Sequence, residues 1–398
     1  MISSPFDPPS NMPGTSSTLE PEWSLLCAAC SPSDTPEQLN RIRTLLQSPI
    51  RWNVLLDLGD RHAVKPLLCH RLSSVQDLVP AEDSASMQKT FHANLRKTLL
   101  LSRELIRIVD LLTNAGIGVM PYKGLALAEL LYHDIALREA GDIDLLIRPT
   151  DLSRVRERVQ ELGYAPHVAF SQAEEEAYLK SGYEYAFDGT AGPNLLEVQW
   201  AIQPRFYAVD LDVSRLFKNA VTLPVAGYSV NTPCLEDLFL VLALHAAKHA
   251  WAKLIWLCDL ARIMTMPRVE WAQIAAQATE LGIVRMVRVT LKLANQLLAT
   301  EIPQEAEKHL PHDSVAAALA SGVQAQIVSG SEFDVESLAY FRLMLRLRER
   351  RFDQLRMLSR LVLTPGPSEW SAIRLPPRLF PLYRLVRLSR LAAKLVTA

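Results

Sequence analysis

The feature that most constrains this chain is a short apolar segment, residues 141–147, that carries two aspartates two positions apart. It reads Gly-Asp-Ile-Asp-Leu-Leu-Ile, and its branched apolar residues favour a β-strand. Because side chains alternate between the faces of a strand, Asp142 and Asp144 share one face while Ile143 and Leu145 enter the core. The fold must therefore hold two carboxylates close together beside a core.

Two neighbouring carboxylates repel each other and raise each other's pKa values. A divalent cation removes that cost, and Mg²⁺ is usually held by one or two carboxylates together with phosphate oxygens. The pair therefore indicates a site for Mg²⁺, with Mn²⁺ as an alternative, and a nucleoside triphosphate (NTP). The other interpretation is an exposed edge strand whose aspartates discourage aggregation. The flanking apolar residues favour an interior strand instead.

A third acid would complete a site for two metal ions, which clamps the attacking and leaving oxygens of a displacement. In residues 195–200, Leu-Leu-Glu-Val-Gln-Trp, Glu197 and Gln199 share one face of a predicted strand. We predict that Glu197 is a metal ligand and also accepts the proton of the nucleophile, directly or through water. The alternative for this isolated glutamate is an ordinary exposed residue.

Upstream of the aspartates, residues 121–124 read Pro-Tyr-Lys-Gly at the end of a predicted strand and before a predicted helix. Gly124 would let a phosphate approach backbone N–H groups, and Lys123 would add a positive charge for the triphosphate. Arg138, four residues before Asp142, is a further candidate for neutralising phosphate charge. A surface loop would explain Lys-Gly equally well, but its place before Asp-x-Asp favours nucleotide binding.

Periodicity and composition divide the chain into five parts. Residues 1–20 are rich in Pro, Ser and Thr, which is typical of a disordered tail. Apolar residues at steps of three and four then predict helical regions over residues 21–115 and 233–330, and a basic helical region over 331–398. Short β-like runs separated by helical segments predict an α/β core over residues 116–232. The predicted class is α+β, with a small mixed sheet between helical regions.

Individual elements follow from the same patterns. Strands are predicted at residues 116–122, 143–147, 183–187 and 195–200. Helices are predicted at residues 125–132, 152–162, 235–264, 271–281 and 283–298.

The composition is that of a folded chain without a dominant charge. It is 49% hydrophobic, and its formal net charge is −1, so any attraction to an anionic partner must be local. Apolar runs such as residues 238–244 fall short of the roughly 20 residues that cross a bilayer, so we expect no transmembrane segment. The start of the chain lacks the pattern of a secretory signal, and we expect a cytoplasmic protein. Five cysteines, including Cys27 and Cys30 in a C-x-x-C, favour packing in helices over a disulfide framework.

The end of the chain is strongly basic. Residues 342–398 hold twelve Arg and one Lys against three acids, a net charge of +10, with leucines interleaved at helical spacing. Such helices could face solvent, or they could meet an anionic partner such as nucleic acid, a membrane surface or an acidic protein.

Polar and aromatic side chains also follow the predicted core in the stretch from residue 245 to 259. They are His245, Lys248, His249, Trp251, Lys253, Trp256 and Asp259. One interpretation is that Lys248, His249 and Lys253 face the nucleotide site and bind phosphate or the acceptor. The other is a buried helix whose polar groups pair among themselves, with Asp259 pairing with Arg262 or Lys253. His245 and His249 have the spacing of two zinc ligands, but Ala246 replaces the acid of the zinc-protease motif.

At these residues the chain resembles the uncharacterised nucleotidyltransferases, a branch of the DNA polymerase β-like superfamily. The stretches that carry the resemblance are Tyr122-Lys123-Gly124, Tyr132, Arg138, Gly141-Asp142-Ile143-Asp144 and Gly163-Tyr164, with residues 49–52, 64–68, 245–259 and 370–383. The resemblance implies a polymerase β-like core, Mg²⁺ on Asp142 and Asp144, Glu197 as third acid, NTP as donor and pyrophosphate as leaving group. Lys123-Gly124 takes the place of the usual Gly-Ser pair, and Gln199 stands where relatives often have His.

The sequence leaves the acceptor open among small molecules, glycans, peptides and proteins. Two alternatives to a general transferase remain. One is an inactive module that binds a nucleotide or a partner, and the other is an antitoxin-like enzyme that modifies one cognate protein.

Overall fold

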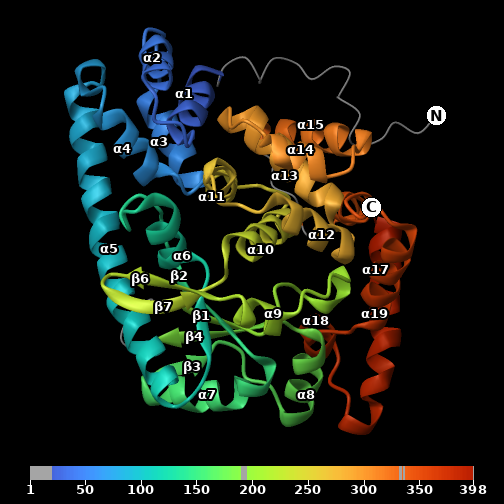
Figure 1. Cartoon of the computed structure of the whole chain (residues 1–398). Helices are drawn as coiled ribbons and strands as arrows, with labels where there is room; N and C mark the ends of the chain where they lie inside the picture. Colours follow the sequence, from blue (N-terminus) through green and yellow to red (C-terminus); the bar gives the residue numbers. More distant parts are fainter. Residues whose placement is uncertain (1–19, 190–194, 331–333, 335–336, 398) are drawn as a thin grey trace.

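The computed structural model describes residues 20–189, 195–330, 334 and 337–397 (Figure 1). Apart from Glu20, the predicted tail at residues 1–20 lies outside the described residues. Four short helices come first: α1 (Glu20–Cys30), α2 (Pro36–Leu45), α3 (Trp52–Arg61) and α4 (Lys65–Ser73). The long α5 (Ala81–Asn114) follows and contacts both α4 and the sheet. α5 therefore belongs both to the N-terminal helical region and to the core that contains the sheet. The division of the chain into domains at residue 115 remains a prediction.

A mixed sheet of five strands lies in the middle of the chain, in the order β1–β2–β5–β4–β3. Its strands are β1 (Val119–Pro121), β2 (Asp142–Ile147), β3 (Tyr164–Pro166), β4 (Glu184–Gly189) and β5 (Leu195–Gln199). β2 and β5 are parallel, and the other neighbouring strands are antiparallel. The predicted α+β class with a small mixed sheet is confirmed.

Helices connect the strands. α6 (Gly124–Leu127) follows β1 and continues as a π-helical turn (Ala128–Tyr132). α7 (Leu152–Glu161) follows β2, and α8 (Gln172–Ser181) lies between β3 and β4. After the sheet come α9 (Val213–Lys218) and a hairpin of β6 (Val221–Val225) and β7 (Tyr228–Thr232).

The two faces of the sheet pack against different helices. One face of β2 packs in a core with α5 and α7 through the side chains of Ile143, Leu145 and Ile147. On the opposite face, Leu146 belongs to a core shared with α10 (Leu235–Lys248). Because faces alternate along a strand, Asp142 and Asp144 lie on this second face.

The predicted helix over residues 235–264 is wrong in its middle. Between α10 and α11 (Leu254–Thr265) the chain turns, and Ala250 and Trp251 have φ values of 49° and 51°. Trp251 is fully buried, and its indole N–H donates a hydrogen bond of 3.0 Å to Thr290 Oγ1. Burying this ring in the core stabilises the turn, although left-handed backbone is unfavourable for residues other than glycine.

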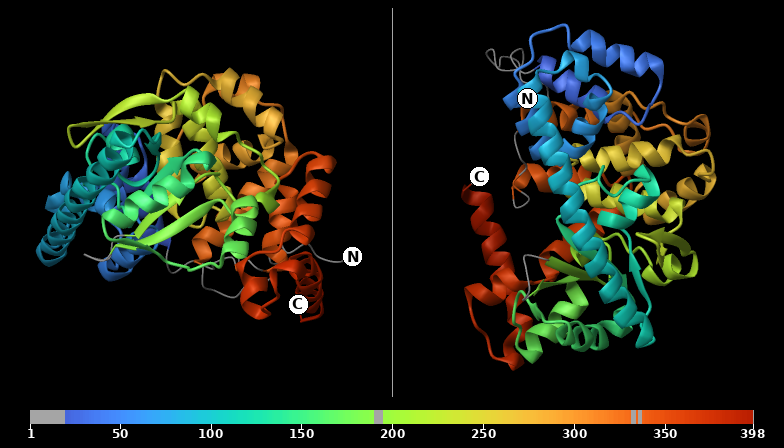
Figure 2. Two further views of the ribbon diagram at one scale, coloured as in Figure 1. Left: turned by 90° about the horizontal axis from the view of Figure 1, so that it is seen from below. Right: turned by 90° about the vertical axis from the view of Figure 1, so that its left-hand side faces the viewer.

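The remaining helices complete the fold. They are α12 (Trp271–Leu281), α13 (Val284–Leu298), α14 (Gln304–His309), α15 (Ser314–Ser329), α16 (Leu338–Arg346), α17 (Arg351–Leu363), α18 (Pro367–Ala372) and α19 (Tyr383–Thr397). Figures 1 and 2 show α5 and the pair α17 and α19 on opposite margins of the molecule. In the described part of the chain, no helix combines the length and the hydropathy that a bilayer span requires. All five cysteines are free, and four of them are buried.

An aromatic cluster ties the C-terminal helices to the sheet. Trp370 of α18 is 3% exposed, and its ring centroid lies 5.8 Å from that of Phe170 and 6.4 Å from that of Tyr178. Tyr178 in turn contacts Tyr185 of β4 and Trp200, the residue after β5. Phe170 and Trp370, which are 200 positions apart in sequence, thus share one small core.

Candidate metal and nucleotide site

β2 and β5 bring three carboxylates together on one face of the sheet. Asp144 and Glu197 are direct cross-strand partners in this parallel pair, and Asp142 pairs with Leu195. One carboxylate oxygen from each of Asp142, Asp144 and Glu197 lies within 4.8 Å of the others. We call these three residues the acid cluster. Its ligand atoms occupy one small volume, as a cation site requires.

The acid cluster is electrostatically unfavourable on its own. Asp144 is 6% exposed, and Asp142 and Glu197 are partly buried. Burial raises the pKa of Asp142 and of Glu197, and the charge of Asp144 raises both further. A cation among these oxygens would favour their ionised forms. Burial, charge and donor type therefore fit a divalent metal.

Glu184, at the start of β4, is a fourth acid beside the cluster that sequence reasoning missed. Its cross-strand partner is Gln199, which is 1% exposed. The side-chain amide of Gln199 donates to Glu184 Oε2 at 3.2 Å, to Glu197 Oε2 at 3.2 Å and to Asp144 Oδ1 at 3.3 Å. One amide thus links carboxylates of three strands. The alternation of residues 184–187 could have predicted this position. Tyr185 and Phe187 pack in the core on the other face of the sheet, so Glu184 must lie on the face of the acid cluster.

Lys123 is a cation that the acid cluster already holds. It lies in the turn between β1 and α6, and its Nζ is 2.8 Å from Asp144 Oδ1, with side chains 12% and 4% exposed. Burial lowers the pKa of Lys123, but the charge of Asp144, its hydrogen bond to Lys123 and further neighbours such as Glu197 together outweigh burial and hold the pKa above its usual value. A positive charge is therefore already accepted at the carboxylate where the sequence predicts a metal.

Gly124 begins α6 beside the same carboxylates. Its φ of +51° lies in the left-handed region, so a residue with a side chain would be strained there. A hollow of about 200 Å³ opens at this turn, and Lys123, Gly124, Asp142 and Asp144 are among the residues that line it.

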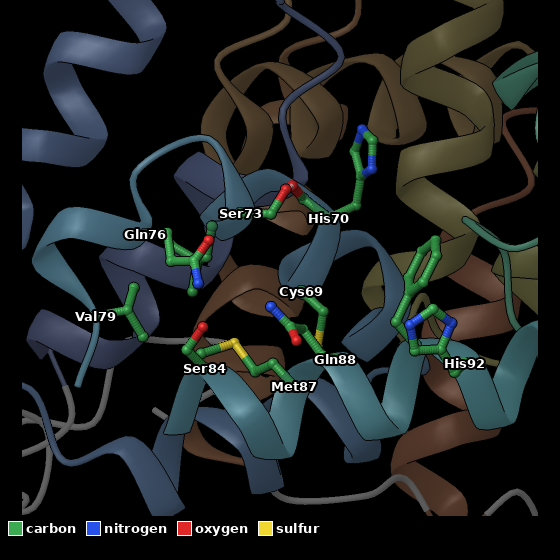
Figure 3. Close-up of a pocket in the computed structure, with 11 residues that line it drawn as sticks. Cys69, His70, Ser73, Gln76, Val79, Ser84, Met87, Gln88 and His92 are labelled. Atoms are coloured by element: carbon green, nitrogen blue, oxygen red, sulfur yellow. Dashed lines mark hydrogen bonds between the residues drawn. The ribbon is translucent and has the colours of Figure 1, made fainter. Parts of the chain in front are cut away.

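A larger hollow, of about 510 Å³, lies elsewhere, between α4 and the start of α5. Figure 3 shows Ser84, Met87 and Gln88 on one side of it and Ser73 and Gln76 on the other. Among the described residues that line this hollow, none carries a carboxylate. We therefore place the candidate site at the smaller hollow, beside the acid cluster.

Arg138 is buried and paired with a residue of α11. Its Nε lies 3.0 Å from Asp259 Oδ1 and its Nη2 lies 3.0 Å from Asp259 Oδ2, with the two residues 7% and 0% exposed. Tyr132 donates a further hydrogen bond of 2.9 Å to Asp259. The pairing of Asp259 with Arg262 or Lys253 was wrong, since Arg138 takes that place. Arg138 Nη1 also lies 3.4 Å from the Gly124 carbonyl, behind the candidate site.

Lys248 lies near the acid cluster and contacts a tyrosine. It ends α10, and its Nζ donates a hydrogen bond of 3.1 Å to the hydroxyl of Tyr183, the residue before β4. The ammonium also lies 4.6 Å from the centroid of that ring. Burial lowers the pKa of Lys248 to about 8, although the charge of Glu184 opposes this.

His249 is the residue after α10 and packs with two other rings. The ring centroids of His245, His249 and Trp256 lie 4.8 to 5.2 Å apart. Burial lowers the pKa of His249 to about 3, so its imidazole is neutral at pH 7. It can therefore offer a hydrogen bond or a stacking surface to a ligand, but no positive charge.

Comparison with known protein families places this geometry in context. Residues 48–299 match a family model described as uncharacterised nucleotidyltransferase. The matched part contains the five-stranded sheet, the acid cluster, Lys123 and helices α10 to α13. Comparisons with curated proteins and with solved structures found no match.

Proposed function

Because this chain belongs to the family of uncharacterised nucleotidyltransferases, we propose that it transfers a nucleoside monophosphate from an NTP to an acceptor and releases pyrophosphate. The observation that carries this proposal is the meeting of Asp142, Asp144 and Glu197 within 4.8 Å on one face of the sheet. Such a set of acids has a net electrostatic cost in the fold, which a catalytic cation would offset.

In this proposal the acid cluster holds Mg²⁺, or Mn²⁺ in its place, through carboxylate oxygens. When bound, the metal supplies positive charge that stabilises the phosphoryl oxygens during displacement. Glu197 would accept the proton of the acceptor's nucleophile, directly or through water. The amide of Gln199 would keep the carboxylates of Asp144 and Glu197 in place, because it donates to both.

Four further groups would bind the nucleotide. Lys123 would pair with phosphate oxygens once a metal replaces it at Asp144, and Gly124 would let the triphosphate approach the backbone. Lys248 and His249 would contact the nucleotide or the acceptor from α10. Arg138 would not contact the nucleotide directly. It would hold the Gly124 carbonyl in place through its hydrogen bond and add positive charge to the site.

The test is incubation of the protein with each labelled NTP and Mg²⁺ in cell lysate. We expect label to appear on an acceptor, and Asp142→Asn to reduce labelling by about 100-fold or more, as loss of charge stabilisation in a transition state does. Asp188→Asn is the matched control, because Asp188 is an exposed acid of β4, another strand of the same sheet. Full labelling by the Asp142 variant would refute the assignment of the site.

The same labelling assay, together with calorimetry, distinguishes a general transferase from the two alternative functions. Label on a single protein would favour the antitoxin-like enzyme, whereas label on a small molecule, glycan or peptide would identify a tailoring transferase. NTP binding in calorimetry without any turnover would favour an inactive nucleotide-binding module.

A further inference from the structure

α17 and α19 each expose apolar side chains along one side of the helix. On α17, Phe352, Leu355 and Leu363 are 72%, 66% and 53% exposed. On α19, Leu385 and Leu388 are 62% and 42% exposed. We call these five residues the apolar surface. On each helix they fall within one arc, because the steps between them are combinations of three and four residues.

Several arginines of the same helices form ion pairs with the rest of the protein. Arg360 of α17 lies 2.6 Å from Asp210, and Arg356 pairs with the same carboxylate. On α19, Arg387 and Arg390 lie 3.1 and 3.2 Å from Glu369, which is 3% exposed. A water-facing helix normally buries its leucines and exposes its arginines. α17 does bury Met357 and Leu361, but both helices also expose the apolar surface while four of their arginines are paired within the protein. The apolar surface is therefore available to a partner.

Exposed arginines adjoin the apolar surface in sequence, since Arg351 precedes Phe352 and Arg384 precedes Leu385. Arg351, Arg378 and Arg384 are exposed, and none forms an ion pair with a residue in the described part of the chain. The segment from residue 342 to 398 carries a net charge of +10. A partner must therefore offer both an apolar layer and negative charge.

This combination decides between the candidate partners. A second copy of the chain would bring the same positive charges together. Single-stranded nucleic acid binds through stacking on aromatic rings, whereas four of the five residues of the apolar surface are leucines. An anionic bilayer offers phosphates at its surface and an acyl layer directly beneath, and amphipathic helices with Leu, Phe and Arg bind there.

We propose that α17 and α19 dock the protein onto an anionic lipid surface. Phe352, Leu355 and the leucines of α19 enter the boundary between headgroups and acyl chains. Arg351, Arg378 and Arg384 contact lipid phosphates. This docking is peripheral and does not depend on the proposed transferase activity.

Vesicle flotation of the full chain tests the proposal. Wild-type protein is expected to float with vesicles that contain phosphatidylglycerol and to stay behind with vesicles of phosphatidylcholine alone. Leu355→Ser combined with Leu385→Ser should weaken partitioning about tenfold or more, because both side chains leave the acyl boundary. Leu99→Ser combined with Leu100→Ser on α5 is the matched control, since these leucines are 51% and 69% exposed on the opposite margin.

A charge variant gives a second readout. Arg351→Gln combined with Arg384→Gln should also weaken partitioning about tenfold, and added salt should weaken wild-type binding. Failure of the wild type to float with anionic vesicles would overturn the proposal. So would unchanged flotation of the Leu355 and Leu385 variant, or lipid-free self-association that this variant abolishes, which would identify a second copy as the partner.

Discussion

Lys123 occupies the position where the acid cluster needs a positive charge. Its ammonium lies 2.8 Å from Asp144 Oδ1, and both side chains are largely buried. The flexible side chain of a lysine can be displaced from a carboxylate when a divalent cation binds there, and its ammonium can then pair with a phosphate. The resting protein thus holds its acids with an internal cation.

We expect Lys123→Met to destabilise the protein more in EDTA than in Mg²⁺. Removing one partner of a buried ion pair costs about 3 to 5 kcal/mol, and a divalent cation on the same carboxylates would restore part of this. Thermal unfolding with and without Mg²⁺ measures the difference. Lys65→Met is the control, because Lys65 pairs with the exposed Asp60 far from the acid cluster in sequence. Equal losses in both conditions would show that Lys123 and the metal do not share a carboxylate.

Alternation along single strands predicted which faces Asp142, Asp144 and Glu197 occupy. It could not predict that Gln199 would join them to Glu184, because that contact depends on the register of β4 against β5. Sequence patterns within one strand contain no information on the register of its neighbours. The roles of Asp142, Asp144 and Glu197 as metal ligands remain predictions, which a metal-binding measurement would test.

At the scale of elements, periodicity located the longer helices well. The predicted helix at residues 271–281 coincides with α12, and the one at 283–298 differs from α13 by one residue. β3, of three residues, and the hairpin of β6 and β7 were missed, since such short strands give weak alternation. The break between α10 and α11 was missed because the burial of Trp251, a tertiary effect, outweighs local helix preference.

An ion pair fixes the first helix to the third. Glu22 of α1 is 1% exposed and accepts hydrogen bonds of 2.9 Å from the backbone N–H and from Nε of Arg51, the residue before α3. These bonds lower the pKa of Glu22 from 4.5 to about 2. The stabilisation is therefore complete above about pH 5 and is lost as the pH falls toward 2.

We expect Glu22→Gln to lower the free energy of unfolding by about 1 to 3 kcal/mol at pH 7, since hydrogen bonds to a buried charge are lost. The difference from wild type should shrink at pH 3, because the Glu22 carboxylate of the unfolded chain, with its ordinary pKa of 4.5, is then protonated and folding must ionise it. Urea unfolding at both pH values measures this. Glu301→Gln, at an exposed position, is the control and should have little effect. A difference that is constant with pH would contradict the ion-pair explanation.

At the scale of the whole molecule, Arg138 and Asp259 join the sheet to the helices behind it. Arg138 precedes β2, and Asp259 lies on α11, 121 residues later in the chain. Tyr132, at the end of the π-helical turn, binds the same carboxylate. The pair therefore sets the position of the candidate site relative to α10 and α11.

Asp259→Asn is expected to destabilise the protein by about 3 to 5 kcal/mol, because the guanidinium of Arg138 is left buried without its counter-charge. Chemical denaturation measures the loss. Asp60→Asn, which breaks the exposed pair with Lys65, should cost less than about 1 kcal/mol. Replacing both partners, as Arg138→Met with Asp259→Leu, should recover part of the stability. A loss no larger than that of the Asp60 variant would argue against a structural role for the pair.

The aromatic cluster around Trp370 means that the family-matched part of the chain is not self-sufficient. The match ends at residue 299, yet Trp370 covers Phe170 and Tyr178 beside the sheet. Burial of such an indole contributes roughly 3 to 5 kcal/mol. A fragment that ends at residue 299 would expose these rings to water, so the C-terminal helices support the family-matched core as well as forming its outer margin.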